Sequence, residues 1–176
     1  MTLTDLASIG SFISGVAVLL SLIYVSVQIR QAKHHQQAAI RLGRADRIVQ
    51  MCFAAGDNAA AEAVLKGHAG AADISEIQLA QYYWICRGFF YHCEEEYFQH
   101  KEGLANEAYY ASFLAGTKKM FCLPGLRVQW RQQRESFVPE FVAFMEALMA
   151  QAQPVWTSDA VGAWTSAIAA EKAGHV

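Results

Sequence analysis

The chain has 176 residues, of which 54% are hydrophobic and 12% aromatic, and its net charge is −2 at neutral pH. That apolar content excludes a disordered chain. The region after residue 47 holds nine Lys or Arg against fourteen Asp or Glu, so nucleic-acid binding has no electrostatic support. The cysteines form no C-x-x-C pair, and we expect reduced thiols instead of a zinc site or a disulfide framework.

The first predicted element is an uncharged run of 24 residues from Leu6 to Ile29. As a helix it would be about 36 Å long at ~1.5 Å per residue, which is enough to cross a hydrocarbon core of about 30 Å. A cleaved signal peptide would need a basic start and a shorter apolar core, whereas Asp5 is the only charge before this run. A buried core helix is the remaining alternative. We expect residues 1–5 to form a short tail and residues 6–29 a transmembrane helix.

The charges that follow this run predict its orientation. Five basic residues, opposed by Asp46 alone, come within the next eighteen positions: Arg30, Lys33, Arg41, Arg44 and Arg47. Because positively charged flanks stay in the cytoplasm, we expect the N-terminus outside and everything after the span inside.

Small residues recur along the predicted span. Ala7, Ser11 and Gly15 are four apart on one face, and Gly10 with Ser14 forms a second such pair. Small side chains let two helix backbones approach closely in lipid, which predicts a self-associating face and a homo-oligomer. The alternative is that Gly and Ser are simply common in transmembrane helices.

Beyond the span, the sequence predicts helices up to the tail. The anchor continues as a juxtamembrane helix over residues 30–55, and Asn58 caps a short helix over residues 59–66 that Gly67 ends. Ser75 and Gln78 have the spacing of a capping box, which opens the longest cytoplasmic helix, about residues 76–102.

Gly103 ends that long helix, and Asn106 caps the next one, over about residues 107–122. Pro124-Gly125 breaks the chain before a helix over about residues 125–135, and a further helix runs from Pro139 to Pro154. Thr157 or Ser158 could cap a short helix in the tail, residues 154–176. No segment shows the alternation of apolar and polar residues that is typical of a half-buried strand. The predicted fold is all-α, a transmembrane helix continuing into a cytoplasmic helical bundle whose main domain covers residues 56–153.

The long helix carries one pattern that resembles a metal site. His92, Glu96 and His100 are spaced i, i+4 and i+8, so they share a helix face. Bundle metal sites draw ligands from several helices, and no second helix offers a matching E-x-x-H. A solvated His/Glu face is the favoured interpretation, and we expect no metal.

The same helix places Arg87 among aromatic residues. Buried charges need a partner, and Glu94 lies two turns further along the same face. Arg87 and Glu94 are therefore predicted to form a structural polar core.

A second basic cluster surrounds a tryptophan and consists of Arg127, Trp130, Arg131 and Arg134. Arginine is the usual bidentate donor to carboxylates and phosphates, so the cluster could receive an anionic partner. Alternatively, these arginines pair with acidic residues of the same chain, for example Glu94–Glu96, or form an ordinary solvated face.

Catalytic motifs are missing from the sequence. It contains no G-x-S-x-G, Walker or Rossmann pattern. We therefore expect no catalytic residue and no cofactor.

Three segments follow one another in a recognisable order. They are Tyr24 with Gln28-Ile29-Arg30-Gln31, then Arg87 with Glu94, Tyr97, Gln99, Gly103 and Leu104, and then Pro124-Gly125 with Arg127 and Trp130. Their order and spacing resemble those of a set of uncharacterised bacterial single-span membrane proteins. The resemblance implies a single-pass protein of the bacterial inner membrane and highlights Arg87, Glu94, Arg127 and Trp130. It implies no activity.

Two functions follow as hypotheses. The first is a non-enzymatic assembly or adaptor module that self-associates or binds another membrane protein. The second is a small-ligand sensor or enzyme with a pocket between helix 76–102 and the Arg127–Trp130 helix, in which Arg87 or Arg127 would be left unpaired.

Overall fold

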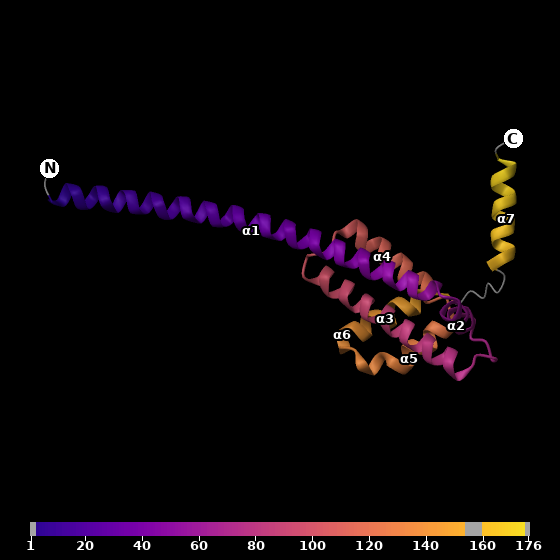
Figure 1. Ribbon diagram of the computed structural model, residues 1–176. Coiled ribbons are helices and arrows are strands. Elements are labelled where there is room, and N and C mark those ends of the chain that lie inside the picture. The colour runs from indigo at the N-terminus through magenta and orange to yellow at the C-terminus, as the bar shows by residue number, and fades with distance from the viewer. Residues whose placement is uncertain (1–2, 154–159, 175–176) are drawn as a thin grey trace. The chain divides into compact units, whose positions relative to one another are not determined.

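The computed structural model describes residues 3–153 and 160–174, and every regular element among them is a helix (Figure 1). In chain order these are α1 (Leu3–Gly56), α2 (Asn58–Ala69), α3 (Glu76–Lys101), α4 (Glu107–Met120), α5 (Pro124–Gln133), the 3₁₀ turn η1 (Arg134–Ser136), α6 (Pro139–Gln151) and α7 (Ala160–Ala173). The all-α prediction is confirmed. The chain divides into two compact units, one ending at Val49 and the other beginning at Gln50.

The first unit is a single helical rod. α1 continues without interruption from Leu3 to Gly56, as the sequence predicts for residues 30–55, and its residues from Gln50 on belong to the second unit. It contains an apolar window with a mean hydropathy of 2.2, of which no residue is buried. By length and composition α1 is therefore able to cross a membrane.

α2 is the first helix that lies wholly within the second unit, and its two ends differ from the prediction. Asp57, not Asn58, is the N-cap of α2, and its carboxylate accepts a hydrogen bond from the Ala59 N–H at 3.1 Å. The predicted stop at Gly67 is wrong, because α2 continues through Gly67 and ends only at Gly70, which has a φ of +66°.

The remaining helix ends follow local capping rules. Ser75 and Gln78 form the expected reciprocal capping box, with N–H to side-chain distances of 3.0 and 3.3 Å. The Asn106 side chain caps α4, and Gly103 ends the α3 region with a φ of +69°. α6 begins at Pro139 as predicted. The predicted break at Pro154 and the caps at Thr157 or Ser158 lie outside the described residues.

α3 is the central helix of the second unit and packs against α2, α4 and α5. The core is strongly aromatic. Phe90 of α3 meets the fully buried Trp130 of α5 at a ring-centroid distance of 5.1 Å, and Phe137 and Phe141 pack on the same tryptophan. Edge-to-face contacts of this kind stabilise a core beyond their buried area.

Two glycines set the spacing of α2 and α5. A Cβ atom added at Gly125 would overlap the backbone carbonyl of Gly67, and one added at Gly67 would overlap the ring of Tyr82. Both glycines are buried. Gly67 is therefore a packing residue inside a helix, which is why it does not end α2.

Gly125→Ala is expected to lower the free energy of unfolding by at least about 2 kcal/mol, because the backbones of α2 and α5 would have to separate. The matched control is Gly116→Ala in α4, where an added Cβ meets open space. That substitution should raise the stability by about 0.5–1 kcal/mol, because alanine is the better helix former. Chemical denaturation of the detergent-solubilised chain, followed by tryptophan fluorescence, measures both. Equal effects of the two changes would contradict the close helix approach.

Candidate functional site

The most constrained polar side chain in the second unit is Arg127 of α5. Its guanidinium Nη1 donates to three backbone carbonyls, those of Phe121, Met149 and Ala152, each at 3.3 Å. Phe121 is the C-cap of α4, and Met149 and Ala152 lie in the last turn and at the C-cap of α6. Arg127 therefore joins the carboxyl-terminal ends of two helices.

Helix ends of this type are where a cation is favourable. The last four carbonyls of a helix lack intrahelical partners, and the helix dipole places partial negative charge there. A side-chain cation close to two such ends satisfies carbonyls and dipoles together. Arg127 thus stabilises the fold, and its donors point at backbone oxygens instead of an external anion.

The other members of the predicted anionic-partner patch do not gather on one surface. Trp130 is fully buried, and its indole N–H donates to Glu146 Oε1 at 3.1 Å. Arg134 donates to the same carboxylate oxygen at 2.8 Å, while Arg131 is exposed. Of the four predicted residues, Trp130 is therefore buried, Arg127 is half-buried against backbone carbonyls, Arg134 forms a partly exposed ion pair, and Arg131 is exposed. The acid that pairs is Glu146, since α6 brings it beside α5, and not Glu94–Glu96.

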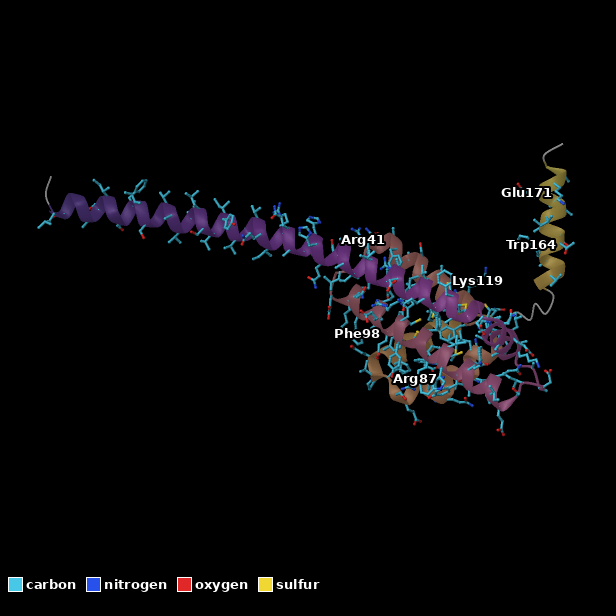
Figure 2. All side chains as sticks on the ribbon, in the orientation of Figure 1. Arg41, Arg87, Phe98, Lys119, Trp164 and Glu171 are labelled. Atoms are coloured by element: carbon cyan, nitrogen blue, oxygen red, sulfur yellow. The ribbon has the colours of Figure 1, made fainter. Side chains whose placement is uncertain are left out.

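Arg87 has a different environment from the one predicted. It lies on α3, where Figure 2 labels it, and is partly exposed. Its guanidinium donates to the hydroxyls of Tyr91 at 2.9 Å and Tyr83 at 3.2 Å, one turn away on either side. The hydrogen bond to Tyr91 raises the pKa of Arg87 above its usual value.

The predicted pairing of Arg87 with Glu94 is not formed among the described residues. Glu94 is two turns away, whereas the two tyrosine hydroxyls are on adjacent turns. Solvent also reaches the guanidinium, so no carboxylate is needed to offset burial of the charge. The tyrosine side chains are the partners that the sequence reasoning missed.

The three residues of the metal hypothesis also separate. His92 Nδ1 lies 3.9 Å from the Glu96 carboxylate, but His100 bonds to Glu107 at 3.0 Å and stacks on Tyr110. Among the described residues no group of three His, Cys, Asp or Glu side chains is placed to hold a metal ion.

The favoured interpretation of a solvated His/Glu face is wrong for Glu96, which is fully buried. The buried residues of α3 follow one stripe at intervals of three or four, namely Tyr82, Cys86, Phe90, Cys93, Glu96 and Gln99. That spacing is the sequence signal that could have placed Glu96 inside. The charge of Glu96, in contrast, favoured a position at the surface.

A pocket of about 160 Å³ opens in the second unit, with a wall that is almost entirely apolar. It lies among the last turns of α1, α2 and α4, the middle of α3 and the start of α5. Its lining includes Met51, His68, Phe89 and Leu126. Neither Arg87 nor Arg127 belongs to its described lining.

Burial disfavours the charged forms of two titratable groups that line this pocket. Burial raises the pKa of the Cys86 thiol to about 12 and lowers the pKa of His68 below its usual value. A protonated thiol is a poor nucleophile. The described wall of the pocket therefore offers mainly apolar contact.

Comparisons of the chain with protein-family models, with curated proteins and with solved structures give no match.

Replacing Arg127 by methionine is expected to destabilise the second unit by about 2–3 kcal/mol, the usual contribution of hydrogen bonds from a charged group. The matched control is Arg131→Met, four residues along the same helix and exposed. It should change the stability by no more than about 0.5 kcal/mol. Denaturation midpoints of the two variants and the parent chain decide the question. If Arg131→Met were as damaging as Arg127→Met, the joining role of Arg127 would be wrong.

Proposed function

We propose that the chain is a single-pass protein of a bacterial inner membrane, with its N-terminus outside and its second unit in the cytoplasm, and that it acts as a non-enzymatic assembly module. The observation that carries this proposal is the apolar window of α1, in which no residue is buried. Large apolar side chains such as Phe12, Leu20 and Leu22 are 73%, 61% and 64% exposed. Contiguous exposed apolar surface is unfavourable in water, and a bilayer would cover it.

The orientation rests on charge. Arg30, Lys33 and Arg41 are exposed on α1 just after the apolar window, and the second unit is acidic overall. The positive-inside rule counts the short basic flank and gives little weight to acidic residues. It therefore favours retention of the second unit in the cytoplasm.

Self-association is supported by the small-residue face of α1, which we define as Ala7, Gly10, Ser11, Ser14 and Gly15. All five are exposed. A Cβ atom added at Gly10 or Gly15 would have no neighbour within 4 Å, so nothing in the described chain fills these positions. A second copy of α1 could approach closely there. The resemblance to bacterial single-span proteins agrees with this proposal.

A second candidate function is a small-ligand sensor, and one observation favours it. A pocket touches both α3 and α5, the two helices named for it in the sequence hypothesis. The arginines expected to serve it are occupied elsewhere, Arg87 by tyrosine hydroxyls and Arg127 by carbonyls. A sensor for an anion is therefore not favoured.

The proposed topology predicts opposite labelling of two thiols in intact cells. With the other cysteines replaced by serine, a membrane-impermeant maleimide should label a Thr4→Cys variant and leave Cys52 unlabelled. Both positions are exposed on the same helix, so accessibility differs only through the membrane. Permeabilised cells, in which both should react, provide the control. Labelling of Cys52 in intact cells would contradict the proposed topology.

If the chain self-associates as proposed, a larger side chain on the small-residue face should weaken the association. Gly15→Leu should weaken association of the full chain in lipid at least about tenfold, or about 1.4 kcal/mol. Val16→Leu enlarges a side chain away from that face and should leave the strength of association unchanged. Native mass spectrometry of nanodisc-embedded protein, over a range of protein-to-lipid ratios, measures both. An assembly insensitive to Gly15→Leu would place the interface elsewhere.

A further inference from the structure

The pocket of about 160 Å³ lies wholly within the second unit, so it depends on neither the membrane span nor the assembly role. We propose that it is a binding site for a small uncharged hydrocarbon group, about the size of a single aromatic ring. An engineered apolar cavity of about 150 Å³ holds benzene, whereas sites for drug-sized ligands have about 300–1,000 Å³.

The wall chemistry fits such a ligand. Phe89, Leu126 and Ile85 present aromatic and aliphatic surface, and Met51 and Met120 also line the pocket. Methionine is flexible and polarisable, and makes favourable contacts with aromatic rings. An apolar ligand in this pocket would make the dispersion contacts that a close-packed interior normally makes.

The polar atoms of the wall select against charge. Its two described titratable groups with shifted pKa values are Cys86, with a raised pKa, and His68, with a lowered pKa, so both are neutral near pH 7. No Asp, Glu, Lys or Arg is among the described lining residues. An ionised ligand would leave its charge buried without a partner.

The pocket is reachable from solvent. Of its two lining cysteines, Cys52 is exposed and Cys86 is buried. The lining therefore extends from the surface of the unit to its interior.

Toluene, with seven heavy atoms and no charge, is the probe, and benzoate is its charged counterpart. The full chain in lipid nanodiscs is labelled with ¹³C at the methionine methyl groups and titrated with each compound. Met51 and Met120 line the pocket, while Met145 and Met149 are buried in the aromatic core and serve as internal controls. Toluene should shift the two pocket methyls saturably and leave the two core methyls in place, and benzoate should shift neither pair.

A larger side chain that fills the pocket should prevent the binding of toluene. Ala55→Phe adds a ring at a lining position, and Ala54→Phe adds the same ring at its exposed neighbour. The apparent Kd for toluene should rise at least about tenfold in the first variant and stay unchanged in the second. Ala55→Leu, a smaller filler, takes its place if the phenylalanine variant does not fold. The proposal is overturned if no saturable shift occurs at Met51 and Met120, if all four methyls shift together, or if a folded filler variant still binds.

Discussion

The segment on which the second unit depends most is the start of α5, and its key interaction is the contact of Arg127 with three carbonyls. A single guanidinium fixes where α4 and α6 end relative to α5. Two residues earlier, Gly125 fixes how closely α5 meets α2. Three residues later, Trp130 fills the core against Phe90 of α3. One short helix therefore sets the positions of four others.

This arrangement explains why residues with catalytic or ligand-binding chemistry serve the fold instead. A small unit has few ways to satisfy helix ends that meet inside it, and buried polar groups without partners are costly. Arg127 satisfies carbonyls at such helix ends, Glu146 accepts hydrogen bonds from Trp130 and Arg134, and Arg87 is held between two tyrosines. None of these three charged residues is among the described lining of the pocket, whose wall is almost entirely apolar. That wall makes hydrocarbon recognition the chemistry it can offer.

The sequence predicts the local features of this fold well. Ser75 with Gln78, Asn106, Gly103 and Pro139 act at helix ends through their own neighbours, so no tertiary information is needed. Features that depend on a distant partner were missed. Gly67 resembles a helix stop until α5 is placed against it, and Arg127 resembles a surface cation until α4 and α6 end beside it. Glu96 belongs to the buried stripe of α3, but the sequence analysis placed it at the surface because it is charged.

The two units solve the burial of apolar surface in different ways. The second unit covers its aromatic core with its own helices, so Trp130, Phe90 and Phe141 are fully buried. The apolar window of α1 is covered by no described part of the chain. The hydrophobic effect acts on this window as it does on the core, so covering it would be favourable. Lipid around the large side chains, and a second copy at the small-residue face, together supply that cover in the proposed function.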